Sequence, residues 1–303
     1  MTITRIETLV FGVADVGACA RFHADAGLEV VQQGDRDALL RTPAGQTLIL
    51  RPMDDPALPP ALEAGPTLRE LRWGVDGRAA LDRIADDLAR DRPVSVDADG
   101  VVHSRDETGL GIGFVLSNPA TLPEHPPRTY NTADSVARWN DPVIPYKRPR
   151  PLRIAHLAYN IPKEGHDAAV DFYLSRLGFK ATDRILDTGT FMQCAGDVEH
   201  HNFFLCHRPD AAGFNHFALD VRDFDELVEA GNYMIERRWD ESRVMGRHLL
   251  GSNLYRFFFS PAGGRLEFIN DMDKLDKDFE TRVWERNPGH HLWSLKSSGQ
   301  PAA

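Results

Sequence analysis

The sequence predicts an α+β protein of two domains, each built from two paired βαβββ modules. Three observations lead to this prediction. The chain has 303 residues, which is enough for two domains with separate cores. Its two halves repeat the same order of apolar segments. Between the halves, residues 119–150 contain seven prolines, a density that favours an extended connector over a helix.

The repeat begins with residues 4–13 and 152–161, which alternate apolar and polar side chains as half-buried strands do. A helix should follow each strand and end at Gly27 or Gly178, because glycine is common just beyond a helix C-terminus. Further strands are then expected at residues 28–31, 37–43, 46–52 and 69–77 in the first half, and at residues 179–182, 189–196, 201–209 and 215–223 in the second.

The second module of each half continues with a predicted helix, at residues 78–88 and 224–236, and closes with a strand pair around a glycine turn. The tail carries Trp284 and Trp293, so we expect it to pack on the second domain or on a neighbouring subunit. The predicted organisation is an N-terminal domain 1–118, a connector 119–150, a C-terminal domain 151–275 and a tail 276–303.

The composition narrows the class of partner. There are 45 acidic and 35 basic residues, giving a formal net charge of −10, which argues against general attraction to nucleic acid or an anionic membrane. No apolar stretch reaches membrane-spanning length, and the first residues do not resemble a secretory signal. The three cysteines form neither a disulfide framework nor a CxxC motif. We therefore expect a soluble cytoplasmic protein with a small-molecule partner.

Three side chains of the second half are candidate metal ligands: His156, His216 and Glu267. Each falls at a matching place on an equivalent strand of successive modules. Two imidazoles and one carboxylate are the ligand set of a facial metal site with open coordination positions, which suits non-haem Fe(II).

The first half provides an internal control for this metal site. The repeat-equivalent positions are Thr8, Glu70 and Gly113. One potential ligand in three cannot hold an iron ion, so the first domain is predicted to be a metal-free scaffold.

Five segments of the second half carry a resemblance to a known family: RIAHLAYN, EHHNFFLCH, GFNHFALDV, MGRHLLGSN and SPAGGRLEFIND. Together they resemble the type I extradiol ring-cleavage dioxygenases, of the catechol 2,3-dioxygenase kind, in the vicinal oxygen chelate (glyoxalase/bleomycin resistance/dioxygenase) superfamily. The resemblance implies Fe(II), or alternatively Mn(II), at the three candidate ligands. It also implies O2 as co-substrate and cleavage of a catechol ring next to its two hydroxyls.

Two further histidines match catalytic positions of that family. The resemblance implies an acid/base role for His201 and a hydrogen bond from His248 to bound substrate, and a near-neutral pKa suits imidazole for moving a proton. His200 should point to the opposite face from His201 if the strand is regular.

Three residues are candidates for binding the substrate. The family usually has a tyrosine ten residues before the glutamate ligand, where this chain has Phe257 and therefore no hydroxyl. Tyr255 lies two residues earlier and would need a bulge to replace it. Arg243 is a candidate partner for a substrate carboxylate.

Two alternatives remain open. The superfamily also includes lyases, isomerases and thiol transferases that use the metal as a Lewis acid, although His201 and His248 disfavour this reading. A non-catalytic protein could instead hold an aromatic ligand in the same cavity, which Phe257 alone supports. For the dioxygenase, the expected partner is a small aromatic diol substrate. We expect a homo-oligomer, with neither nucleic acid nor membrane as a partner.

Overall fold

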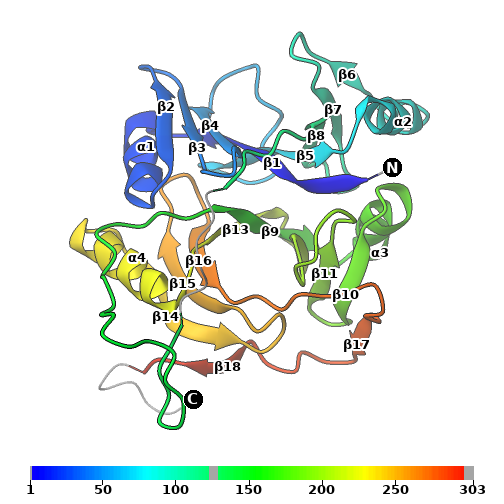
Figure 1. Cartoon of the computed structure of the whole chain (residues 1–303). Helices are drawn as coiled ribbons and strands as arrows, with labels where there is room; N and C mark the ends of the chain where they lie inside the picture. The colour runs from blue at the N-terminus through cyan, green and yellow to red at the C-terminus, as the bar shows by residue number, and fades with distance from the viewer. Residues whose placement is uncertain (1, 123–128, 297–303) are drawn as a thin grey trace.

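The computed structural model describes residues 2–122 and 129–296. It contains two mixed β-sheets, one from each half of the chain, stacked with helices at their ends (Figure 1). This arrangement confirms the predicted two-domain α+β fold. In the described part of the chain, no helix is long and apolar enough to cross a bilayer.

The first sheet has eight strands in the order β2-β3-β4-β1-β5-β8-β7-β6. Its two modules meet where β1 pairs antiparallel with β5. The elements are β1 (Ile3–Val13), α1 (Val16–Asp25), β2 (Glu29–Gln33), β3 (Ala38–Arg41), β4 (Thr47–Pro52), β5 (Thr67–Val75), α2 (Arg78–Leu88), β6 (Ser95–Val96), β7 (Val102–Arg105) and β8 (Gly111–Leu116).

The second sheet repeats this order and adds one strand at each edge: β17-β10-β11-β12-β9-β13-β16-β15-β14-β18. The same modules recur because the same apolar alternation recurs in the sequence. The elements are β9 (Arg153–Pro162), α3 (His166–Asp171), the π-helical turn η1 (Phe172–Arg176), β10 (Lys180–Ile185), β11 (Gly189–Gln193), β12 (Phe203–Arg208), β13 (Gly213–Asp220), α4 (Phe224–Glu236), β14 (Glu241–His248), β15 (Leu254–Phe259), β16 (Arg265–Asn270), β17 (Arg282–Trp284) and β18 (His291–Ser294).

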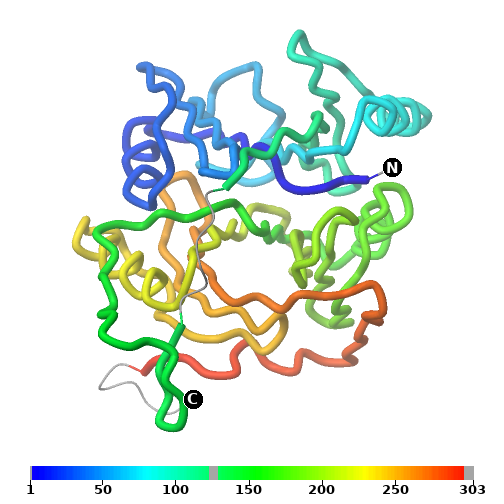
Figure 2. Tube along the Cα trace, in the orientation of Figure 1, coloured from blue at the N-terminus to red at the C-terminus, as the bar shows by residue number. Residues whose placement is uncertain are grey.

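The C-terminal tail crosses the open side of the second sheet. Its first strand, β17, pairs with β10 at one edge, and β18 pairs with β14 at the other. In Figure 2 the red end of the chain follows the lower side of the second domain between these strands. The tail therefore bridges the two edges of the sheet that carries the candidate metal ligands.

The described part of the connector runs beside the second domain. Residues 119–122 and 129–150 contain no helix or strand. Near its end, the Tyr146 hydroxyl donates to Asp223 and the Arg150 backbone N–H donates to Glu226. These bonds attach the connector to the start of α4.

A continuous apolar core joins the two sheets. Trp73 of β5 is fully buried and makes edge contacts with Phe179 and Phe203 of the second domain. The buried Gln46 amide donates to the carbonyl of Ile154 and accepts from its N–H. Because this interface is mainly apolar and the bonds of Gln46 join its two sides, the two domains form one support for the site.

One buried histidine at this interface makes the stability of the protein sensitive to acid. His23 of α1 is fully buried and stacks on Phe217 of β13. Burial lowers the pKa of His23 to about 4, against 6.5 for an exposed histidine, although its bond to the Cys19 carbonyl opposes the shift. Above pH 6.5 the ring is neutral in both states. As the pH falls towards 4, only the unfolded chain takes up the proton, so folding stability is lost.

We expect His23→Phe to remove this acid sensitivity, since phenylalanine keeps the ring but cannot be protonated. Between pH 7 and pH 4 the parent should lose about 3 kcal/mol more unfolding free energy than the variant. Urea unfolding curves at both pH values measure the difference. An equal loss in parent and variant would show that other groups control the acid response.

Candidate metal centre and its cavity

The strand register places the three candidate ligands on one face of the second sheet. Ala218 of β13 stands between His156 of β9 and Glu267 of β16 as their direct pairing partner. His216 precedes Ala218 by two residues and therefore points to the same face. The small Ala218 side chain leaves the space between the ligands free.

The ligand atoms converge closely enough to share one ion. His156 Nε2 lies 2.9 Å from Glu267 Oε2 and 3.3 Å from His216 Nε2, and the third separation, His216 Nε2 to Glu267 Oε2, is 3.3 Å. Adjacent ligands of an octahedral ion with bonds of about 2.1 Å are about 3.0 Å apart. The three atoms therefore match one face of an octahedron, the geometry of a 2-His-1-carboxylate site.

The electrostatics of the site also suit a cation. Burial raises the pKa of Glu267, but hydrogen bonds from His156, His216 and His248 outweigh it and hold that pKa well below its usual range. Burial lowers the pKa of His216 to about 4. At neutral pH the group therefore offers an ionised carboxylate and a neutral imidazole, which are the forms that bind metals.

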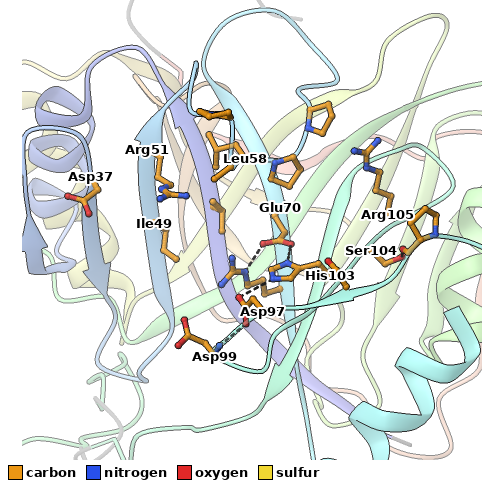
Figure 3. Close-up of a pocket in the computed structure, with 18 of the residues that line it drawn as sticks. Asp37, Ile49, Arg51, Leu58, Glu70, Asp97, Asp99, His103, Ser104 and Arg105 are labelled. Carbon is orange, nitrogen blue, oxygen red and sulfur yellow. Dashed lines mark hydrogen bonds and ion pairs between the residues drawn. The ribbon is translucent and has the colours of Figure 1, made fainter. Parts of the chain in front are cut away.

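The first domain has the same register with different side chains. Arg72 stands between Thr8 and Gly113, as Ala218 stands between the ligands of the second domain. Glu70, in the place of His216, accepts from Arg72 and from His103 over 2.6 Å each. Figure 3 shows Glu70 and His103 side by side in this pocket. The carboxylate of Glu70, which could have been a metal ligand, is thus already occupied by its hydrogen bonds to Arg72 and His103.

The cavity of the first domain, about 1100 Å³, is larger than the cavity of about 310 Å³ over the triad. Size alone therefore does not identify the reactive site. Within residues 2–122 and 129–296, the convergent group of three metal-ligating side chains is the one in the second domain. Its cavity is lined by the triad together with Phe191, Phe204, Phe257, Arg208, Arg243, Arg265, His201, His248 and His290.

His201 lies beside the triad, whereas the predicted direction of His200 is wrong. The His201 ring is buried and its centroid is 4.4 Å from that of His156. β12 begins only at Phe203, so the two histidines precede the regular strand and do not alternate between faces. Instead their Nδ1 atoms lie 2.9 Å apart.

His248, at the end of β14, holds the outer oxygen of the carboxylate ligand. Its Nε2 is 3.3 Å from Glu267 Oε1, and its Nδ1 is 3.0 Å from the carbonyl of His290. Tyr255 stacks on the His248 ring at 4.2 Å, and its hydroxyl is bonded to His291. Tyr255 is not among the residues that line the cavity, so it supports His248 from behind.

Phe257 faces the cavity. It pairs directly with Glu267, and its ring meets the His216 ring edge-on at 5.1 Å. The guanidinium groups of Arg243 and Arg265 lie over the Phe257 ring at 5.2 and 5.0 Å. The wall of the cavity beside the triad is thus an aromatic ring in contact with two guanidinium groups.

The sequence argument missed two residues that orient this wall. The Asn215 side-chain oxygen lies 2.9 Å from His216 Nδ1 and accepts from Arg265 over 2.5 Å. Such a bond to the outer nitrogen fixes the orientation of a ligating histidine. Asn215 directly precedes His216, and Arg265 lies two residues before Glu267, but nearness in the sequence does not predict the contact between them.

Comparison with known proteins finds relatives of the second half of the chain. Residues 153–268 match the model of the Glyoxalase/Bleomycin resistance protein/Dioxygenase superfamily. Over 129 residues the chain is 31% identical to metapyrocatechase 2 of Cupriavidus necator. That match covers 43% of this chain and 39% of the relative, so the chain matches about two fifths of the length of that relative.

Solved structures match the fold over nearly the whole chain. The Mn(II)-bound glyoxalase from Novosphingobium aromaticivorans is 21% identical, covers 100% of this chain and 96% of its own, and has a TM-score of 0.76. Homoprotocatechuate 2,3-dioxygenase from Brevibacterium fuscum is 17% identical, with coverages of 98% and 91% and a TM-score of 0.74. At these identities the likeness shows the fold.

Proposed function

We propose that the second domain is an Fe(II)-dependent extradiol dioxygenase, which opens a catechol-type ring next to its two hydroxyls and incorporates both atoms of O2. The observation that carries the proposal is the octahedral-face geometry of His156, His216 and Glu267, with His201 and His248 beside it. The 31% identity to a metapyrocatechase over part of the chain supports it. We assign iron rather than Mn(II) from the ligand set.

Iron held by the triad would leave coordination positions open for both catechol oxygens and O2 and would supply the electron transfer between them. The residues around it have separate tasks. His201 accepts a proton from a catechol hydroxyl and later returns it, because burial and the neighbouring histidines hold its pKa well below 6.5 and keep the ring neutral. His248 keeps its Nδ1 bond to the His290 carbonyl and donates from Nε2, which lies 3.3 Å from Glu267 Oε1 in the substrate-free site, to a substrate oxygen.

The arginine side chains of the cavity favour a substrate with a negative charge. Arg208, Arg243 and Arg265 line the cavity, and burial lowers the pKa of Arg265. An arginine side chain nevertheless stays protonated in proteins. We propose that Arg243 binds an anionic ring substituent while Phe257 packs against the ring. A carboxylated catechol is therefore expected to be turned over with a lower KM than catechol.

The test is anaerobic reconstitution with Fe(II), followed by a panel of substituted catechols with O2 uptake and a yellow ring-opened product as readouts. Uptake with iron bound supports the proposal. Metal binding without O2 uptake would indicate a Lewis-acid enzyme of the superfamily, and aromatic-ligand binding without metal would indicate a binding protein. Reconstitution with Mn(II) in parallel tests the choice of metal.

Phe257→Tyr is expected to raise kcat/KM on unsubstituted catechol about tenfold, since a buried hydroxyl near a developing oxyanion contributes on the order of 1–3 kcal/mol. Steady-state O2 uptake measures it. Phe259→Tyr is the matched control, because Phe259 lies two residues further along the same strand and is 57% exposed. No change in Phe257→Tyr on any catechol would mean that residue 257 does not contact the substrate.

We infer a reducing compartment, the cytoplasm, from the three cysteines, which are all free and buried. The expected homo-oligomer remains a prediction. Sedimentation of the purified protein measures its oligomeric state.

A further inference from the structure

The contact between His200 and His201 continues into a buried chain of polar groups. His200 is fully buried, and its Nε2 lies 2.7 Å from Asp183 Oδ2 on β10. Its Nδ1 lies 2.9 Å from Nδ1 of His201. Both nitrogens of His200 are therefore engaged, one by a carboxylate and one by the imidazole at the cavity.

The C-terminal tail fixes the far end of this chain. Arg282 of β17 donates to both oxygens of Asp183, over 2.9 and 2.6 Å, and the indole N–H of Trp284 donates over 2.6 Å. β17 lies beside β10 in Figure 1. Burial raises the pKa of Asp183, but the hydrogen bonds from His200, Arg282 and Trp284 outweigh it and lower the pKa below its ordinary value. Asp183 is thus an ionised acceptor.

These contacts determine which nitrogens carry protons. A carboxylate only accepts hydrogen bonds, so the Nε2 of His200 must donate to Asp183. The Arg282 guanidinium lies 3.2 Å from the same nitrogen. With its ring proton at Nε2, His200 holds a lone pair at Nδ1. This lone pair accepts from the Nδ1–H of His201, whose Nδ1 is 2.9 Å away. The other nitrogen of His201, Nε2, is left with its lone pair.

We propose that His200 and Asp183, held by Arg282, are positioning residues that fix His201 as the Nδ1–H tautomer with Nε2 available to the cavity as a base. This inference rests on the proposed function only for the role of His201. Orientation of a histidine by a buried carboxylate is familiar from catalytic triads. In this protein the imidazole of His200 lies between the carboxylate of Asp183 and the histidine that it orients, His201. A proton taken up at Nε2 leaves the Nδ1–H bond to His200 intact, so His201 can return it without reorganisation.

Two substitutions at one position separate this role from packing. In His200→Gln, the amide oxygen can accept from His201 and the amide N–H can donate to Asp183, so the tautomer should persist. In His200→Leu, both bonds are lost. The tautomer is read from the ¹⁵N NMR spectrum of the ¹⁵N-histidine-labelled, metal-free full-length chain, with the His201 signals identified by their absence in His201→Asn.

We expect Nδ1–H at His201 in the parent and in His200→Gln, and a mixture with Nε2–H in His200→Leu. In the iron-loaded enzyme, His200→Leu should lower kcat at least tenfold with little change in KM, and His200→Gln should restore kcat to within about threefold of the parent. Nε2–H at His201 in the parent, or the same tautomer in parent and His200→Leu, would overturn the proposal. If the tautomer of His201 differs between parent and His200→Leu as expected, but the parent cleaves no catechol, only the proposed function is overturned.

Arg282→Gln provides a milder variant if His200→Leu does not fold, because the Arg282 side chain is 42% exposed. It should shift the His201 tautomer in the same direction, by a smaller amount. Arg286→Gln, the same change at an exposed residue of the same tail, is the control and should leave the spectrum unchanged. Identical spectra for Arg282→Gln and Arg286→Gln would exclude the role proposed for Arg282.

Discussion

His216→Ala is expected to abolish iron retention and, with it, O2 uptake, while the chain stays folded. His216 supplies one of three ligands from the rim of the cavity, where its side chain is 14% exposed, against 3% for His156 and none for Glu267. Its removal therefore costs the least packing, while two remaining ligands hold a divalent ion far more weakly than three. Iron content per chain after gel filtration is the measurement, with a thermal melt to verify folding.

The internal repeat provides the control for this experiment. Thr8→Ala changes the position in the first domain that corresponds to His156, where the hydroxyl is bonded to Thr47. Its iron content should equal that of the parent. Full iron content in purified His216→Ala would refute the metal site, and iron loss in Thr8→Ala would indicate that the first domain takes part in metal binding.

His201→Asn should retain iron and catechol but turn over at least a hundredfold more slowly, which is the usual size of a lost acid/base group. Asparagine keeps a polar side chain that can still bond to His200, but it cannot take up a proton at neutral pH. The measurements are iron content, catechol affinity under anaerobic conditions and kcat. Turnover at the parent rate would transfer the acid/base role to another group, and His200 would be examined next.

His290→Asn is the matched control for the substitution of a cavity histidine. His290 also lines the cavity, but it contacts His248 through its backbone carbonyl, which the substitution leaves in place. Its kcat should stay within about twofold of the parent. A drop as large as that of His201→Asn would show that any histidine lost from this cavity slows the enzyme.

The fold was predictable because it repeats. Apolar alternation located the strands, and both long helices begin and end where expected, over Arg78–Leu88 and Phe224–Glu236. β14 was not identified, because residues 241–248 are half-buried and contain three charged side chains, which hides the alternation. β17 and β18 were missed for a different reason. They are only three and four residues long and gain their order from pairing with distant edges.

The metal site was predictable because histidine and glutamate are rare on buried strands, and His156, His216 and Glu267 stand at equivalent positions of such strands. The strand register then brought them together as the repeat implied. The direction of His200 could not be obtained in this way, because it depends on a local break in the strand before Phe203. Its bond to Asp183, and that of Asp183 to Arg282, join segments 17 and 99 residues apart. No local pattern encodes such contacts.

The tail strands also decide which strands form the edges of the second sheet. β17 and β18 cover both edges of the second sheet, so the backbone groups of β10 and β14 are already hydrogen-bonded on both sides there. In the described part of the first sheet, β2 and β6 pair on one side only, and β2 exposes every residue. Unpaired edges are where chains add to one another. A strand from another copy of this protein would therefore add to β2 or β6 on the first sheet and to β17 or β18 on the second. In the second sheet, β10 and β14 would keep the partners that they have.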